Sequence, residues 1–356
     1  MRPMLLATLV CGFACKDKPA PPSPAPPPRS VTTVPTSPPT STPRLSRIAL
    51  PGAGSDAVSL DYLMFDAHTN TVWIPAANTG SVDVVDTSTR QVHQIDGFPT
   101  KAVQHDGKTR LVGPSSAALG DGVVYIGNRA DQSICAISET TFERGKCTTL
   151  NESPDSVTYV RTTKEVWVTT PRDNSIRILD ASTLAQTARV ELPGAPEGFA
   201  MDVNSGRFYT NLEDHDTTLV IDVTSHAVVA TWKPNCGEAG PRSLRVDGDA
   251  GLLFVACTSK VETLSIHNEG QIVGSVDAGA GVDDFDYAPT SHLLYVGAAT
   301  AGTLTIADIA GDGGLTKREV IPTVVGARNG VVDAAGVVYL AHGAASELVV
   351  VATKAK

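Results

Sequence analysis

The chain has 356 residues, of which only 19 % are charged. Its formal charge of −10 repels phosphate groups and anionic lipid headgroups, so neither nucleic acid nor a bare membrane surface is an expected partner. With 31 glycines, 24 prolines and no amphipathic run at helical spacing longer than a turn or two, the composition favours short strands joined by tight turns.

The first residues are typical of an export signal. Arg2 precedes an apolar stretch, residues 4–14, that is too short to span a bilayer. The sequence Gly-Phe-Ala-Cys at 12–15 resembles the box of bacterial lipoproteins in which the cysteine is acylated, although Phe13 is atypical. We expect residues 1–14 to be a lipoprotein-type signal peptide and Cys15 to carry the lipid. An ordinary secretory signal cleaved elsewhere, or a misplaced start codon, is the alternative.

Residues 15–43 are nearly all proline, serine, threonine and alanine. Such a composition cannot bury a core and favours extended polyproline II, which makes a tether. We therefore expect the protein to be exported, to lie in the periplasm or at the cell surface, and to be anchored to the outer membrane through the N-terminal lipid only.

One β-rich motif recurs through residues 44–356. Each copy has an aromatic residue in the middle of an apolar triplet, follows a polar turn, and precedes a second strand that opens with serine or threonine. The central aromatics are Trp73, Tyr125, Trp167, Tyr209, Phe254, Tyr295 and Tyr339, at spacings of 41 to 52 residues. Four short antiparallel strands in each such period are typical of a propeller blade.

Seven copies predict an all-β fold, a seven-bladed β-propeller. The last copy ends with a strand at 347–353 and lacks a fourth strand, whereas a lone strand at 45–52 closely matches residues 189–194. We therefore expect the N- and C-terminal strands to pair in one blade, which closes the ring and removes exposed sheet edges.

Residues 166–211, which include Asp-Asn-Ser-Ile-Arg-Ile-Leu-Asp at 173–180 and Pro-Glu-Gly-Phe-Ala at 196–200, resemble the YVTN-repeat family of surface and periplasmic propellers. The resemblance covers about residues 44–354 and implies architecture more than function, because the family mixes binding proteins, surface-layer proteins and members without a known role. The tryptophan–aspartate pair of cytoplasmic WD propellers is absent.

Four cysteines lie within the repeats, and in an exported chain disulfides are the default over metal ligands. Cys135 and Cys147 lie six residues on either side of a turn near Thr141, so they are expected to pair. Cys236 and Cys257 are the second expected pair, and free buried thiols are the alternative.

The innermost strand of each blade is expected to begin about twelve residues before the marker aromatic. Aligned in this way, seven polar side chains converge on one channel mouth: Asp61, Ser115, Asp155, Glu197, Arg242, Asp283 and Arg328. Four carboxylates in one funnel need a cation or the arginines to offset them. The ring is interpreted as a ligand pocket, or simply as ion pairs such as Asp283–Arg328 and Glu197–Arg242.

Two further features lie on this side of the predicted ring. The insertion at 99–114 carries Lys101, His105, Lys108 and Arg110, and it either covers the mouth or is a surface loop. His342 is the one histidine considered for acid–base chemistry, with a structural packing role as the alternative.

The sequence favours a non-enzymatic, membrane-tethered monomer that binds a protein, glycan or small ligand at the channel mouth, without an organic cofactor. One alternative is a metal-dependent hydrolase or lyase resembling the gluconolactonase and streptogramin-lyase propellers, with a divalent metal held by the acids; the asparagine ligands and the aromatic-Thr-Glu motif of those enzymes are not matched. The other is a propeller subunit of a periplasmic dehydrogenase, which predicts an exposed apolar patch for a partner chain.

Overall fold

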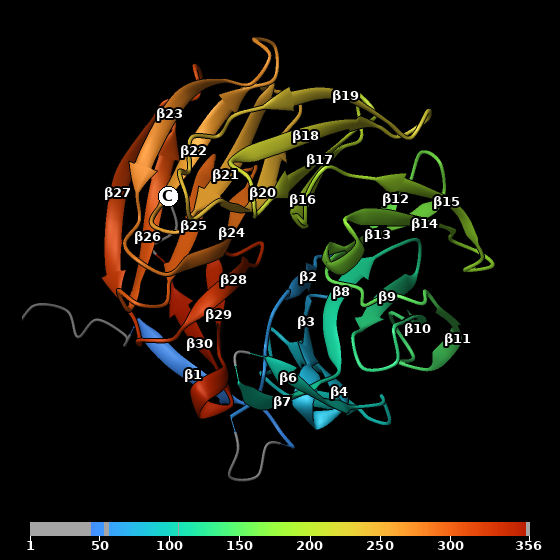
Figure 1. Ribbon diagram of the computed structural model, residues 1–356. Coiled ribbons are helices and arrows are strands. Elements are labelled where there is room, and N and C mark those ends of the chain that lie inside the picture. Colours follow the sequence, from blue (N-terminus) through green and yellow to red (C-terminus); the bar gives the residue numbers. More distant parts are fainter. Residues whose placement is uncertain (1–43, 53–56, 106, 354–356) are drawn as a thin grey trace, which may run out of the picture. The chain divides into compact units, whose positions relative to one another are not determined.

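The computed structural model describes residues 44–52, 57–105 and 107–353. Within them, seven four-stranded antiparallel sheets follow one another around a ring, as Figure 1 shows. The predicted seven-bladed β-propeller is therefore confirmed. The expected signal peptide, the acylation site Cys15 and the tether lie outside the described residues.

Each blade has the same strand order from the channel outward. The innermost strands are β2 (Met64–Asp66), β8 (Pro114–Leu119), β12 (Val157–Val160), β16 (Pro196–Asp202), β20 (Pro241–Asp247), β24 (Val282–Ala288) and β28 (Arg328–Val332). The second strands carry the marker aromatics and are β3 (Thr71–Ala76), β9 (Val123–Asn128), β13 (Glu165–Thr170), β17 (Arg207–Leu212), β21 (Leu252–Cys257), β25 (Leu293–Ala298) and β29 (Val337–His342). The third strands are β4 (Ser81–Asp86), β10 (Ser133–Ser138), β14 (Ser175–Asp180), β18 (Thr217–Asp222), β22 (Lys260–Ser265), β26 (Thr303–Ile309) and β30 (Glu347–Ala352). The outer strands are β5 (Val92–Ile95), β11 (Arg144–Thr149), β15 (Gln186–Glu191), β19 (Ala227–Trp232), β23 (Gln271–Asp277), β27 (Leu315–Pro322) and β1 (Leu45–Ala49).

The ring is closed by strands from the two ends of the described chain. β1 pairs antiparallel with β30 over five residues, from Leu45 opposite Val351 to Ala49 opposite Glu347. Figure 1 shows blue β1 lying against red β30. The closing blade thus takes its outer strand from the start of the propeller sequence, as the repeat predicted, and has four strands like the other six blades.

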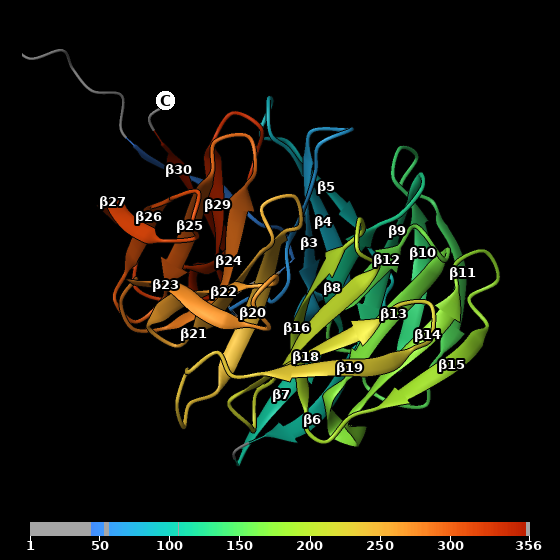
Figure 2. The same cartoon turned by 90° about the horizontal axis from the view of Figure 1, so that it is seen from above.

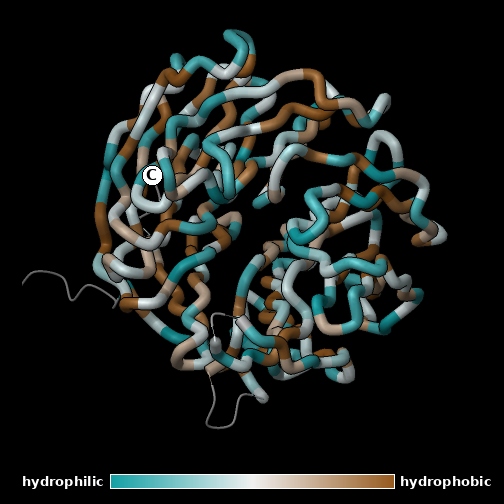
Figure 3. The backbone as a smooth tube through the Cα atoms, viewed as in Figure 1, coloured by the Kyte–Doolittle hydropathy of each residue, from teal (hydrophilic) through white to brown (hydrophobic). Residues whose placement is uncertain are grey.

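The hydrophobic core lies between neighbouring blades. Trp167 of blade three packs on Phe208 of blade four with ring centroids 4.8 Å apart, and both side chains are fully buried. Figure 3 shows hydrophobic segments recurring from blade to blade. Each sheet therefore buries both faces against its neighbours, which is why the strands read as apolar runs with an aromatic at the centre.

Helical structure is limited to three short 3₁₀ turns, η1 (Ala77–Thr79), η2 (Pro171–Asp173) and η3 (Gly343–Ala345), in the part of the chain that the structure describes. None of the helices found there is long and apolar enough to cross a membrane.

The insertion at 99–114 forms a two-stranded hairpin, β6 (Lys101–His105) and β7 (Lys108–Val112). It packs on η1 of blade one, where Gly113 approaches so closely that a Cβ would lie 2.0 Å from the carbonyl oxygen of Ala77. Figures 1 and 2 place the hairpin at the periphery of the ring, over blade one. Its charged side chains Lys108 and Arg110 are exposed.

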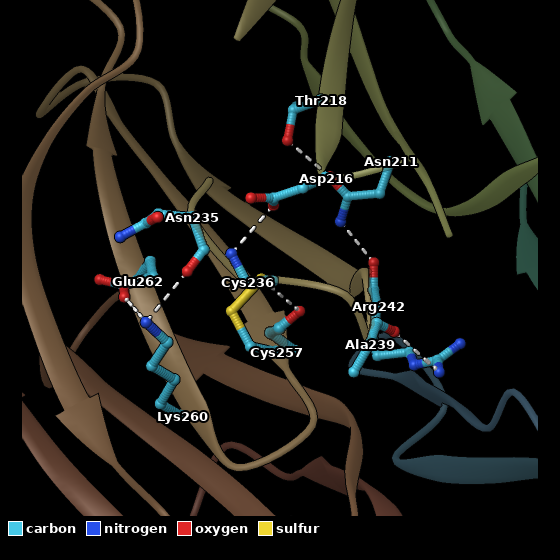
Figure 4. The surroundings of a disulfide bond; sticks show 11 residues. Asn211, Asp216, Thr218, Asn235, Cys236, Ala239, Arg242, Cys257, Lys260 and Glu262 are labelled. Atoms are coloured by element: carbon cyan, nitrogen blue, oxygen red, sulfur yellow. Dashed lines mark hydrogen bonds and ion pairs between the residues drawn. A yellow bond between two sulfur atoms is a disulfide. The ribbon is translucent and has the colours of Figure 1, made fainter. Parts of the chain in front are cut away.

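Both expected cysteine pairs are disulfides. Cys135 and Cys147 are direct cross-strand neighbours on β10 and β11, with Cα atoms 4.0 Å apart. Cys236, in the connection between blades four and five, is bonded to Cys257 at the end of β21, and its backbone N–H donates to Asp216 at 2.9 Å (Figure 4). Two disulfides indicate an oxidising, extracytoplasmic compartment.

Candidate functional site

The channel has two ends, which we call the upper mouth, where the innermost strands begin, and the lower mouth, where they end. In blades two, four, five, six and seven the register of the innermost strand shifts just after its first or second residue. Such bulges turn side chains out of the regular alternation. In blade four the bulge contains Gly198 (φ +64°), where a Cβ would lie 2.7 Å from the Cα of Ser243 in blade five.

Three blades meet through one arginine at the upper mouth. The Nη2 group of Arg129, in the turn between the second and third strands of blade two, donates to Asp61 Oδ2 of blade one at 2.8 Å. The same group is ion-paired with Asp155 of blade three. Arg129 thus offsets two of the carboxylates that the repeat alignment predicted at this mouth.

Tyr62 connects opposite sides of the channel. It precedes β2 in blade one, and its hydroxyl donates to Glu197 Oε1 in blade four at 2.8 Å and lies 3.4 Å from Asp155 Oδ2. Blades one and four are three places apart in a ring of seven, so this side chain reaches across the channel. We call Asp61, Tyr62, Arg129, Asp155 and Glu197 the upper cluster.

The upper cluster is electrostatically strained because it holds more acids than bases. Burial, together with the charges of Asp155 and Asp283, raises the pKa of Asp61 to about 6, although Arg129 opposes the shift. Burial and the neighbouring carboxylates Asp155 and Asp61 raise the pKa of Glu197 well above its ordinary value. Burial and the same carboxylates also raise the pKa of Tyr62, which therefore stays a hydrogen-bond donor.

Asp283 and Arg328, from blades six and seven, form the ion pair that the sequence suggested, with Arg328 Nη1 and Asp283 Oδ2 2.9 Å apart. Asn329, at the blade-seven bulge (φ +51°), donates to the same Oδ2 at 3.0 Å and accepts the backbone N–H of Asp284 at 3.1 Å. The charge of Asp283 is therefore already balanced.

The other suggested pair, Glu197 with Arg242, does not form. Glu197 accepts from Tyr62 instead, and Arg242 pairs at 2.8 Å with Glu213, next to the carbonyl of Ala239 to which it also donates (Figure 4). The reason is that Arg242 has two nearer partners, Glu213 in the turn after β17 and the carbonyl of Ala239 in the loop closed by the Cys236–Cys257 disulfide.

Ser115 is also placed at the upper end of its strand, but it is only 1 % exposed. Its hydroxyl makes no hydrogen bond with the described residues, whereas its carbonyl accepts the backbone N–H of Tyr62 at 3.2 Å. Ser115 thus holds Tyr62 in place through its backbone.

His342 lies at the end of β29, is buried, and bonds Glu347 Oε1 through Nδ1 at 2.9 Å. This contact joins the two strands on either side of η3, which fits the structural alternative given above. Across residues 44–52, 57–105 and 107–353, no group of three His, Cys, Asp or Glu side chains is arranged to hold a metal ion.

Below the upper cluster, the channel widens into a cavity of about 880 Å³ that we call the channel cavity. All seven innermost strands contribute to its lining, and Tyr62 belongs to both the lining and the upper cluster. At its lower mouth lie the turns after the innermost strands, where Val203 is 54 % exposed. The lining therefore runs from Tyr62, whose side chain crosses the channel, to these turns, where Val203 is exposed.

Blades five and six place a charged triad in the wall of the channel cavity. Arg245 of β20 donates through Nε to Asp286 Oδ1 at 3.1 Å and through Nη2 to Asp284 Oδ2 at 3.2 Å, while its Nη1 donates to the carbonyl of Leu244 at 2.8 Å. Burial raises the pKa of Asp286, and Arg245 opposes the shift. The guanidinium is thus fully engaged by the protein.

Sequence reasoning missed Tyr62, Arg129 and Arg245. The repeat alignment selected one position near the start of each innermost strand, whereas Tyr62 is one residue after the selected Asp61 and Arg245 is three residues after the selected Arg242. Arg129 comes from a turn between two other strands. No spacing signal in the chain distinguishes these residues; only the ring geometry brings them to the channel.

No protein-family model matches the chain, and no curated protein matches it. Among solved structures, a chain in the crystal structure of the mitotic checkpoint complex is similar, with a TM-score of 0.68, 16 % identity, and coverage of 98 % of this chain and 100 % of that chain. Hydrazine synthase of Kuenenia stuttgartiensis is similar with a TM-score of 0.68 and 15 % identity, over 85 % of this chain and 97 % of that chain. At these identities the similarity shows the fold: this is a seven-bladed β-propeller with a channel cavity.

Proposed function

We propose that this protein is a non-enzymatic, extracytoplasmic propeller that binds a small ligand in its channel cavity. The observation that carries the proposal is the cavity itself. Its volume of about 880 Å³ lies within the range of small-molecule sites, about 300–1,000 Å³, and its walls combine apolar side chains with a few oriented polar groups. The upper cluster, which includes three of the residues expected from the repeat to bind the ligand, is proposed as the closed end of the cavity, which a ligand meets through Tyr62.

The proposal includes attachment to a membrane. We infer that residues 1–14 direct export, that Cys15 carries a lipid, and that residues 15–43 are the tether of a YVTN-type propeller. The two disulfides support an extracytoplasmic site. Labelled palmitate should be incorporated by the full-length protein and not by its Cys15→Ser variant; incorporation by the variant would remove the anchor from the proposal.

The binding function is tested by thermal unfolding of the full chain against a library of small organic molecules. A ligand that binds only the folded state raises the midpoint temperature, and the rise grows with the logarithm of its concentration once that exceeds the dissociation constant. Val203→Trp, at the lower mouth, should weaken the binding of any such ligand, because the larger side chain narrows the opening. Val320→Trp is the matched control, since Val320 is 44 % exposed on the outer strand β27.

A library without a single stabilising compound, or hits that bind both tryptophan variants like the parent protein, would contradict binding in the cavity. A divalent-metal series belongs in the same experiment. A shift with one metal that is lost in Asp283→Asn would favour the hydrolase or lyase alternative over the binding protein.

A further inference from the structure

The channel cavity has two chemically different halves. Blades one to three contribute no charged side chain among the described residues that line it; their part of the wall includes Leu63, Phe65, Leu119 and Val157. Blades four to seven contribute all its charged residues. These are Asp202, Arg245, Asp247, Asp249, Asp284, Asp286 and Asp333.

The acidic half carries six aspartates against one arginine, an excess of five formal negative charges. The charge of Arg245 is already offset by Asp284 and Asp286, and each nitrogen of its guanidinium already donates a hydrogen bond within the protein. A negatively charged ligand would therefore meet repulsion without a compensating cation. The field in a cleft lined by charges of one sign and by low-dielectric walls attracts the opposite charge.

The aspartates nearest the opening are positioned to meet a ligand. Asp249 is exposed, with one carboxylate oxygen accepting from the side chain of Asn204 at 2.9 Å. Asp247 accepts the hydroxyl of Tyr287 at 2.5 Å, so an aromatic ring lies beside a carboxylate in the wall. Aromatic faces and carboxylates together are the surroundings that organic cations prefer.

Two serines of the lining have hydroxyl groups that are buried behind the surface of the cavity wall. Ser116 and Ser243 belong to the lining and are 1 % and 2 % exposed. Neither hydroxyl has a hydrogen-bond partner among the described residues. Buried hydroxyls without a partner are uncommon in folded proteins and call for an explanation.

Resting on the proposed function, we infer that the channel cavity binds an organic cation: an amine or ammonium group carried on an apolar body. The apolar body lies against blades one to three, and the cationic group lies against the aspartates of blades four to seven. A neutral hydrocarbon would leave the excess negative charge of those carboxylates without a counter-ion, and a bare metal ion would leave the apolar half of the cavity unused.

The test uses three probes of one chain length, octylammonium, 1-octanol and octanoate, titrated calorimetrically into the full chain at low salt. We expect octylammonium to bind at least about tenfold more tightly than 1-octanol, because a charge–charge contact near a protein surface adds that much or more. Octanoate should bind most weakly. Affinity for octylammonium should fall as salt is added.

The matched variants are Asp247→Asn/Asp249→Asn and Asp312→Asn. The first should lower the affinity for octylammonium at least about tenfold and leave the affinity for 1-octanol unchanged, since asparagine has the size of aspartate but no charge. The second removes a charge from an exposed turn outside the cavity and should change nothing. Circular dichroism checks that the double variant is folded. If it is not, the comparison of the three probes on the wild-type protein still tests the inference.

Equal or tighter binding of 1-octanol or octanoate would overturn the cation inference while leaving a ligand-binding cavity. An equal loss of octylammonium affinity in Asp312→Asn would show that only the net charge of the protein matters, and it would also overturn the cation inference. If none of the three probes binds but the compound library yields neutral ligands sensitive to Val203→Trp, the inference fails and the proposed function stands. If no compound of either kind binds, both fail.

Discussion

The hydroxyl of Tyr62, at the start of blade one, donates a 2.8 Å hydrogen bond to Glu197 of blade four on the opposite side of the channel. Tyr62→Phe removes this donor and keeps the ring. Leaving a buried acceptor without its partner costs about 1–3 kcal/mol, so the free energy of unfolding should fall by that amount in urea denaturation.

Tyr159→Phe is the control for this prediction. Its hydroxyl donates to Asp121 Oδ2 at the same distance of 2.8 Å, but at an exposed site where water replaces the lost donor. Its stability should be close to that of the wild type. Equal effects of the two variants would mean that the cross-channel bond is no more important than a surface one.

Glu197→Gln tests the electrostatic state of the upper cluster. Since burial raises the folded-state pKa of Glu197 above its ordinary 4.5, the protonated carboxyl is favoured by folding. Its stabilising contribution is complete below pH 4.5 and is lost as the pH rises through the folded pKa. The variant should match the wild type near pH 4.5 and have the higher melting temperature at pH 8.

Asp180→Asn is the comparison for a carboxyl group whose pKa is shifted in the opposite direction. Hydrogen bonds from Ser182 and Thr183 lower the pKa of Asp180 to about 2, so its contribution is present above pH 3.8 and is lost as the pH falls through about 2. Melting curves between pH 2 and 8 should show the two variants diverging from the wild type in opposite directions. A constant offset for Glu197→Gln across this range would contradict the raised pKa.

Arg245→Gln should be strongly destabilising. It leaves Asp284 and Asp286, whose side chains are only 4 % and 18 % exposed, without their common cation. Breaking a buried pair in this way costs about 3–5 kcal/mol, measured by urea unfolding.

Arg318→Gln breaks a comparable arginine–aspartate pair with Asp308 on the outside of blade six. The side chains of Arg318 and Asp308 are 31 % and 40 % exposed, and such a surface pair contributes at most about 1 kcal/mol to the free energy of unfolding. A similar loss in both arginine variants would show that the channel triad is solvated like a surface pair.

The disulfides should stabilise the propeller by restricting the unfolded chain. Their cysteines are 12 and 21 residues apart, and the loop-entropy model gives about 3 kcal/mol for loops of this length. Cys135→Ala/Cys147→Ala and Cys236→Ala/Cys257→Ala should each lower the free energy of unfolding by about that amount. Adding reductant to the wild type should lower its melting temperature, while the quadruple variant should not respond.

The fold followed from the sequence because a propeller is built from local repeats. The marker aromatics, from Trp73 to Tyr339, each mark one four-stranded sheet. Only the last copy of the repeat lacks an outer strand, so the lone strand at 45–52 is expected to complete that blade. Within the blades every pairing except that of β1 with β30 joins strands that follow one another in the chain, so periodicity and turn positions are enough to predict it. The cysteine pairs were predictable for the same reason, since each joins nearby positions of one repeat or connection.

The site depended on the tertiary structure. Alignment placed Asp61, Asp155 and Glu197 at one mouth, but whether a side chain there meets solvent, a base or a hydroxyl is decided by three or four blades at once. Tyr62 reaches Glu197 across 135 positions of the chain, and Arg129 enters from a different turn. The repeat thus predicted several of the residues that approach the channel. Closure of the ring decided their partners and left the cavity below them, because those contacts join residues of different blades that are far apart in the sequence.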